Sequence, residues 1–362
     1  MPYPCGRSKI VAVESWREIR EELGELIRSV VTSTTGLSDE ARARVREDVE
    51  HLRRLVVAQR TPRVAVVGKM DVPLVRVLEP FGATVEHGEV LERLGHGRWY
   101  DHQAKLGRVR LADLRCEDRA CLKPLDYERP DLCLAVARSE DEDVEIVADA
   151  LLQALERVDD HWTGYPPAVV AVFRESDGRN AGDFKTIQAF KDAFVQRGLS
   201  RDFVEVVAAS RSDKLARAIV GEAPDEIRIA LARMTDDRVT KRQLADDLVG
   251  IASSLSAAIA TIPIPVADIV PITTVQMTMI AGVAYLSGRD VDVRNIAEFL
   301  TAMGLNVGAG LALRSLVRAL VKLIPVAGPV VSATVAAGAT KTLGRAAMRH
   351  YLDPAPSRVR LP

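Results

Sequence analysis

The chain has 362 residues, of which 48% are hydrophobic and 4% aromatic, and its formal net charge is −1. This length predicts two domains, because it exceeds what a single hydrophobic core usually organises. The apolar fraction excludes disorder over most of the chain, and the near-neutral charge argues against a nucleic-acid binder held by bulk electrostatics.

The average charge hides a difference between the two ends of the chain. Residues 248–362 contain ten Lys or Arg and five Asp or Glu, which gives this part a net charge of +5 and leaves −6 for the rest. Charged residues make up about 13% of this part and about 34% of the remainder. Such a change in composition predicts a domain boundary and different surroundings for the two parts.

The spacing of the cysteines and the composition of the N-terminal segment indicate the cellular compartment. Cys5, Cys116, Cys121 and Cys133 are spaced like neither a zinc site nor a disulfide framework, so we expect reduced thiols. The first residues include no long apolar segment of the kind found in secretory signals. Both features favour a protein that faces the cytoplasm.

Two helices are predicted before the first strand. Apolar residues recur at three- and four-residue steps between Ser15 and Val31, which indicates an amphipathic helix with Ser15 as its cap. A second helix is predicted from Ser38 to about Gln59, after a polar break. We therefore expect residues 1–60 to form a helical N-terminal extension.

Strands and helices alternate over the next segment. Short apolar runs predict strands, and the segments between them predict helices at 72–81, 141–158 and 185–197. The predicted strands are 63–68, 99–102, 108–112, 131–137, 168–173 and 203–208. This order is typical of an α/β domain with a mostly parallel sheet, which we assign to residues 61–222.

From about Pro224 only helices are predicted. Four stretches have almost no charge and are punctuated by glycine and proline: 248–267, 269–288, 299–313 and 323–340. Two of them reach the length of about 20 residues that a membrane span needs, although both include Pro, Ser and Thr. We assign residues 223–352 to an apolar, all-α domain and residues 353–362 to a tail.

The order of elements from residue 63 to 210 resembles a Ras/Era-type GTPase domain. In that family the first strand opens into G-x-x-x-x-G-K-[ST], whose backbone N–H groups and Lys hold phosphates and whose hydroxyl binds Mg²⁺. Here Gly68 fits the first glycine, while Pro73, Leu74 and Val75 stand where the second glycine, the Lys and the hydroxyl belong. The resemblance therefore implies a Ras-like fold whose P-loop is degenerate.

The other motifs of that family are degenerate in the same way. Its D-x-x-G aligns with Asp113-Leu-Arg-Cys116, and its guanine-reading [NT]-K-x-D aligns with Arg174-Glu-Ser-Asp177. If a nucleotide binds, the resemblance places Gly68, Lys69, Asp113 and Asp177 around it. We predict no catalytic residue, no resident metal and no GTP hydrolysis; GTP with Mg²⁺ is the cofactor that weak residual binding would involve.

Histidines offer one further candidate site. His87, His96 and His102 share one loop region with Glu89 and Asp101, a set that could hold a metal or form an ordinary solvated loop.

The C-terminal part, over about 240–352, resembles the YcjF-type domain of unknown function that follows Era-like GTPase domains in bacteria. The resemblance is carried by Ile262-Pro-Ile-Pro-Val-Ala-Asp268, by Leu323-Ile-Pro-Val-Ala-Gly328 and by Thr340-Lys-Thr-Leu-Gly344-Arg345. It implies membrane association. Arg314, Arg318 and Lys322 recur every four residues and form a basic stripe, which either meets anionic lipid or is a solvated helix face.

These observations predict a pseudo-GTPase that acts as a scaffold or regulator at the bacterial inner membrane, bound peripherally or integrally. Its expected partners are membrane lipid, anionic lipid in particular, and another GTPase or a second copy of the chain, with no nucleic acid. One alternative is a divergent GTP-binding protein that switches its membrane or partner contacts. A second alternative is a soluble helical adaptor.

Overall fold

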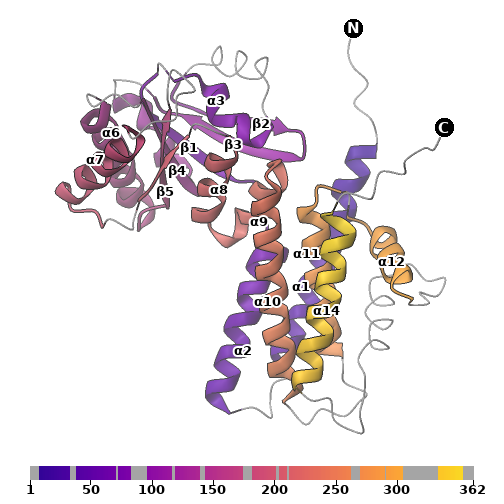
Figure 1. Cartoon of the computed structure of the whole chain (residues 1–362). Helices are drawn as coiled ribbons and strands as arrows, with labels where there is room; N and C mark the ends of the chain where they lie inside the picture. Colours follow the sequence, from indigo (N-terminus) through magenta and orange to yellow (C-terminus); the bar gives the residue numbers. More distant parts are fainter. Residues whose placement is uncertain are drawn as a thin grey trace. The chain divides into compact units, whose positions relative to one another are not determined.

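Figure 1 shows the protein as a computed structural model. The chain divides into two compact units, Arg60–Thr240 on the one hand and Met1–Gln59 with Lys241–Pro362 on the other, and each is treated by itself below. Of residues 8–15 and 182–184 the structure describes the backbone alone. The residues that it describes are 8–32, 38–70, 72–82, 96–115, 119–138, 143–173, 182–200, 204–209, 212–261, 270–289, 291–304 and 333–353.

The unit Arg60–Thr240 is built on a six-stranded sheet with the strand order β2-β3-β1-β4-β5-β6. Neighbouring strands pair in parallel, except that β2 and β3 form an antiparallel hairpin. The strands are β1 (Arg63–Gly68), β2 (Trp99–Ala104), β3 (Gly107–Asp113), β4 (Leu132–Arg138), β5 (Ala168–Phe173) and β6 (Val204–Ala208). The predicted α/β class with a mostly parallel sheet is confirmed.

Helices cover both faces of this sheet, so the central strands β4 and β5 are apolar along almost their whole length. On one face α6 (Asp143–Trp162), α7 (Gly182–Gln196) and the short α5 (Pro124–Tyr127) enclose the main core. On the other face α8 (Ser212–Glu222) packs against β5, β6 and the turn η2 (Glu79–Phe81). Figure 1 shows α6 and α7 on one side of the strands and α8 on the other.

Helix α9 (Asp225–Met234) belongs to the α/β unit, whereas the sequence placed it in the all-α domain. The backbone N–H of Arg60 donates a hydrogen bond of 2.9 Å to the carbonyl of Glu226 at the start of α9. Near its other end, Arg233 Nε donates one of 3.0 Å to the carbonyl of Leu106, in the turn between β2 and β3. These contacts explain why the unit extends to Thr240.

The second unit is all-α, as predicted for the C-terminal part. Its helix α11 is apolar on all sides and buried along nearly its whole length, which makes it the centre of the unit. The helices are α1 (Ser8–Thr32), α2 (Asp39–Leu52) with the π-helical turn η1 (Arg53–Val57), α10 (Arg238–Ala260), α11 (Val270–Leu286), α12 (Val293–Ala302) and α14 (Ala333–Tyr351).

Helices α1 and α2 group with the C-terminal helices, which differs from the separate N-terminal extension that the sequence suggested. The apolar face of α1 supplies the reason, because Leu23 and Ile27 are fully buried and α1 packs along α11. The ring of Trp16 stacks on that of Tyr285, with centroids 4.5 Å apart and an interplanar angle of 11°. Helix α1 thus contributes, from Trp16 onward, to the same core as the helices after residue 240.

A buried polar chain links three helices of this unit. Gln276 Nε2 on α11 donates to Thr340 Oγ1 on α14, and that hydroxyl donates to Ser256 Oγ on α10, each over 3.0 Å. Burial of these groups without partners would cost free energy, so the bonds fix how α10, α11 and α14 are aligned.

Several predicted features of the C-terminal part lie outside the described residues: the segments 262–268 and 323–328, and the stripe of Arg314, Arg318 and Lys322. None of the helices that the structure describes has both the length and the apolar character that crossing a bilayer would require.

The cysteines that the structure describes give a mixed result. Cys121 is disulfide-bonded, which corrects the expectation of reduced thiols for that residue. Cys133 in β4 is a free thiol, and its complete burial raises its pKa to about 12.

Close packing at a glycine of α14 generates a test of the helical unit. A Cβ at Gly344 would lie 2.4 Å from Val249 Cγ2 on α10 and 3.0 Å from Met279 Sδ on α11. Because both neighbours are packed, Gly344→Ala is expected to lower the free energy of unfolding by about 1–3 kcal/mol, measured by urea denaturation.

Gly338 on the same helix is the matched control, since a Cβ there would meet nothing within 4 Å. Gly338→Ala is expected to raise stability by about 0.5–1 kcal/mol through helix propensity alone. Adding Val249→Ala to Gly344→Ala should restore part of the loss. Equal effects of the two glycine substitutions would contradict this packing.

Candidate functional site

The loop that follows β1 begins at Gly68, the residue that fits the first glycine of a P-loop. Gly68 has φ +109°, and a Cβ there would lie 2.3 Å from the carbonyl oxygen of Val136 on the neighbouring strand β4. Any larger residue would therefore collide with the sheet itself. The backbone turn at the end of β1 is by itself a sufficient reason for a glycine at this position, whether or not a ligand binds.

The next part of the loop is packed into the core. The side chain of Leu74, at the position of the phosphate-binding Lys, is 2% exposed, and so is that of Val72. Pro73 precedes α3 (Leu74–Leu78), a helix of five residues that has no side-chain cap. Apolar contacts thus hold the segment that would surround phosphates in an active GTPase, and its proline lacks the N–H group that such a loop would offer.

A buried arginine links this loop to the end of β3. Arg115 is 2% exposed and is among the largest fully buried side chains of the described residues. Its Nε donates to Asp113 Oδ1 over 2.8 Å, and its Nη2 donates to Asp113 Oδ2 over 2.9 Å. Its Nη1 donates to the carbonyl oxygen of Val72 in the loop after β1. One guanidinium therefore joins the end of β3 to the loop after β1.

Three hydrogen bonds from Arg115 hold the carboxylate of Asp113. Oδ1 accepts from Arg115 Nε and from the backbone N–H of Arg115, the latter over 3.2 Å. Oδ2 accepts from Arg115 Nη2 and lies 3.1 Å from His96 Nδ1. A carboxylate offers about four lone-pair positions. Three hydrogen bonds from Arg115 thus occupy most of these positions, while among the described residues His96 Nδ1 lies close without forming a hydrogen bond.

The predicted site residues are brought together only in part. Gly68 ends β1 and Lys69 follows it, while Asp113 ends the adjacent strand β3, where it is paired with Val66. Lys69 is half-buried and already has an interaction partner. Asp177, the guanine-reading candidate, lies outside the described residues.

No metal centre is formed by the part of the chain that the structure describes, where His, Cys, Asp and Glu side chains make no group of three or more suited to an ion. Of the histidine candidates, His96 faces Asp113 and His102 is buried on β2, while His87 is outside the described residues.

The sequence analysis missed Arg115, the residue that organises this site. The alignment with D-x-x-G concerns Asp113 and Cys116 and gives no role to the arginine between them. A signal was present, because residues two apart in extended chain point to the same side and Asp-x-Arg is then spaced for an ion pair.

No protein-family model matches the chain, and no curated protein is significantly similar to it. The resemblance to Ras/Era-type domains therefore rests on the order of the elements and on the degenerate motif residues.

The Arg115–Asp113 pair generates a stability test. Arg115→Met removes one partner of a buried ion pair and leaves the Asp113 carboxylate uncompensated, so the free energy of unfolding should fall by about 3–5 kcal/mol. Chemical denaturation followed by circular dichroism would measure it. Arg108 on β3 is exposed, and Arg108→Met should change stability by less than about 0.5 kcal/mol.

A second substitution tests whether the loss of stability comes from the unpaired charge of Asp113 or from the changed shape of the side chain at position 115. Asp113→Asn in the Arg115→Met background should recover part of the loss, because a neutral amide is less costly to bury than a carboxylate. A loss for Arg115→Met no larger than that for Arg108→Met would contradict the assigned role.

Proposed function

We propose that the α/β unit is a pseudo-GTPase domain and that the chain acts as a scaffold or regulator rather than as an enzyme. The single observation that carries this proposal is the guanidinium of Arg115, which ties Asp113 to the Val72 carbonyl. It supplies positive charge within the fold, at the place where a Mg²⁺ ion and the P-loop Lys would supply it in a working GTPase.

Hydrolysis of GTP depends on groups that this chain does not present at the matching positions. Phosphoryl transfer is catalysed mainly by positioning and by neutralisation of charge, through a Lys, a metal-binding hydroxyl and backbone donors. Leu74 and Val75 supply neither charge nor a metal ligand, and Pro73 supplies no donor. We therefore expect no turnover of GTP.

A scaffold role follows by analogy at the level of the fold, since a domain that no longer reacts can keep its protein-binding surface. The partner we propose is another GTPase or a second copy of this chain. The strand order, with its single antiparallel hairpin β2–β3, supports the relation to Ras/Era-type domains.

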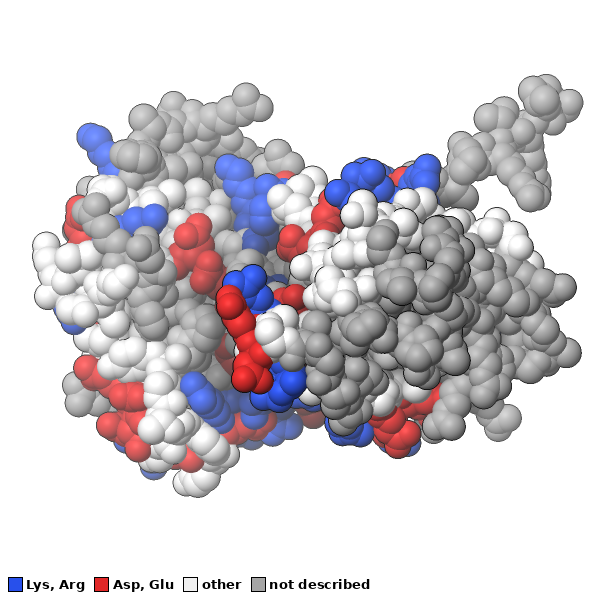
Figure 2. All heavy atoms as spheres, turned by 90° about the horizontal axis from the view of Figure 1, so that it is seen from below, with Lys and Arg blue, Asp and Glu red and all other residues white. Residues whose placement is uncertain are grey.

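The helical unit is proposed to bring the protein to a membrane as a peripheral or inserted element. The support is the net charge of +5 over residues 248–362, together with the resemblance of this part to YcjF-type domains. On the face shown in Figure 2, basic and acidic side chains are interspersed among the described residues.

Nucleotide titration tests the pseudo-GTPase proposal directly. The purified full-length protein is titrated with fluorescent GTP and GDP analogues, with and without Mg²⁺. We expect no Mg²⁺-dependent, guanine-selective binding at micromolar concentrations, because Arg115 already holds the Asp113 carboxylate through three hydrogen bonds. Fluorescent ATP analogues serve as the control for non-selective attraction of phosphates.

Submicromolar binding that needs Mg²⁺ and prefers guanine would contradict the proposal. It would favour instead a divergent GTP-binding protein that switches its contacts.

Flotation with lipid vesicles tests the membrane role. The protein should float with vesicles that include phosphatidylglycerol and should float less with neutral vesicles of phosphatidylcholine, because anionic headgroups attract basic segments. Raising the salt concentration should weaken the difference. Complete recovery in the unbound fraction with both lipids would instead support a soluble helical adaptor.

A further inference from the structure

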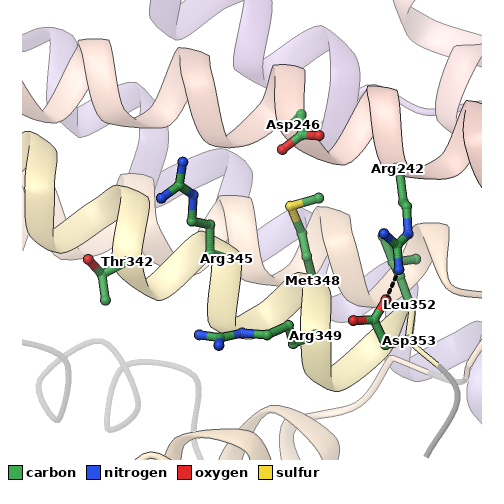
Figure 3. A pocket seen from close by; sticks show the side chains of 8 residues that line it. All are labelled: Arg242, Asp246, Thr342, Arg345, Met348, Arg349, Leu352 and Asp353. Atoms are coloured by element: carbon green, nitrogen blue, oxygen red, sulfur yellow. Dashed lines mark hydrogen bonds and ion pairs between the residues drawn. The ribbon is translucent and has the colours of Figure 1, made fainter.

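A pocket in the helical unit has the composition of an anion site. It lies between the first turns of α10 and the C-terminal half of α14 and has a volume of about 580 Å³, within the range typical of small-ligand sites. Figure 3 shows the side chains that surround it. They are Arg242, Asp246, Thr342, Arg345, Met348, Arg349, Leu352 and Asp353.

Two of the three arginines in this pocket are not neutralised. Arg242 is paired with Asp353, so these two charges cancel. Arg345 and Arg349 form no hydrogen bond or ion pair with any described residue, and no ion pair joins either of them to Asp246. The lining therefore has a net formal charge of +1, and two of its guanidinium groups have no partner among the residues that the structure describes.

The spacing of these arginines suits one ligand group. Residues four apart on a helix lie on the same face, so Arg345 and Arg349 present their guanidinium groups one turn from each other on α14. Guanidinium groups bind phosphate oxygens through pairs of parallel hydrogen bonds, and two such groups can share one phosphate. Arg349 also lies in the last turn of α14, where the helix dipole favours a cation, but Arg345 is one turn earlier and has no such explanation.

The rest of the lining adds apolar surface. Met348 and Leu352 are half-buried in the pocket and are themselves four residues apart, beside the two arginines. A small inorganic ion would leave this surface exposed to water. A ligand with a charged head and an apolar chain would cover it.

We propose that this pocket binds the phosphate group of an anionic amphiphile, with Arg345 and Arg349 on the phosphate and Met348 and Leu352 against the chain. Such a group is found on a phospholipid and on soluble phosphate esters. This inference deepens the proposed membrane association and is independent of the pseudo-GTPase proposal.

The test titrates the full-length protein with dihexanoyl phosphatidic acid below its micellar concentration and measures binding by calorimetry. The Arg345→Ala/Arg349→Ala double variant should bind about tenfold or more weakly, because both charge-assisted contacts are lost. Arg28→Ala/Arg46→Ala removes the same charge from exposed sites on α1 and α2 and should bind as the unchanged protein does.

Asp246 provides a variant with the opposite expected effect. Its carboxylate lines the pocket and repels an anion, so Asp246→Asn should tighten binding severalfold. This gain cannot come from damage to the fold. Equal affinities of the unchanged protein, the arginine double variant and Asp246→Asn would overturn the proposal.

Two further arms identify the source of the phosphate. Inorganic phosphate should compete only at much higher concentration than the short-chain lipid, and the arginine double variant should float less with phosphatidylglycerol vesicles than the Arg28→Ala/Arg46→Ala control. Competition by inorganic phosphate at the same concentration as the lipid would overturn the lipid as the source.

The same variants separate this inference from the proposals above. Short-chain lipid binding without vesicle flotation would support the pocket and contradict the membrane role. Nucleotide binding that disappears in the Arg345→Ala/Arg349→Ala variant and does not need Mg²⁺ would belong to this pocket, and it would leave the pseudo-GTPase proposal standing.

Discussion

The ion pair of the buried guanidinium of Arg115 is the interaction that joins the end of β3 to the loop after β1 in the α/β unit. It connects the carboxylate at the end of β3 with the backbone of the loop after β1. In a working GTPase a nucleotide and its Mg²⁺ connect the corresponding segments. We propose that the arginine replaces that ligand. Because protein groups then close the loop, the loop needs no phosphate-binding surface, and this explains why Leu74 and Pro73 can stand in it.

The helical unit depends on a different constraint, the close approach of three helices around α11. Gly344 lets α14 lie against Val249 and Met279, and Gly282 lets α11 lie against Val56 of the π-helical turn. Ser256, Gln276 and Thr340 then align the same helices through buried hydrogen bonds. Arg345 and Arg349 of the same helix are exposed and line the proposed anion pocket between α14 and α10.

Much of the α/β fold could be predicted from the sequence, because buried parallel strands such as 131–137 and 168–173 are continuous apolar runs between amphipathic helices. The grouping of the units could not, since the pairing of Trp16 with Tyr285 is a contact between distant parts of the chain that no local pattern encodes. At the site, the sequence predicted the loss of the P-loop groups at Pro73, Leu74 and Val75. It did not predict that Arg115 would be buried, because an arginine near a strand end is usually exposed and only the fold shows it to be buried.

Hydrogen–deuterium exchange tests the central claim most directly, because it reports on the Arg115 linkage and on nucleotide at the same place. Exchange is followed in peptides that cover residues 69–82 and 107–115, with and without millimolar GTP and Mg²⁺. The account predicts protection of both segments in the protein alone and no further protection when nucleotide is added. Increased protection of both segments by GTP with Mg²⁺, and not by GTP alone, would contradict it.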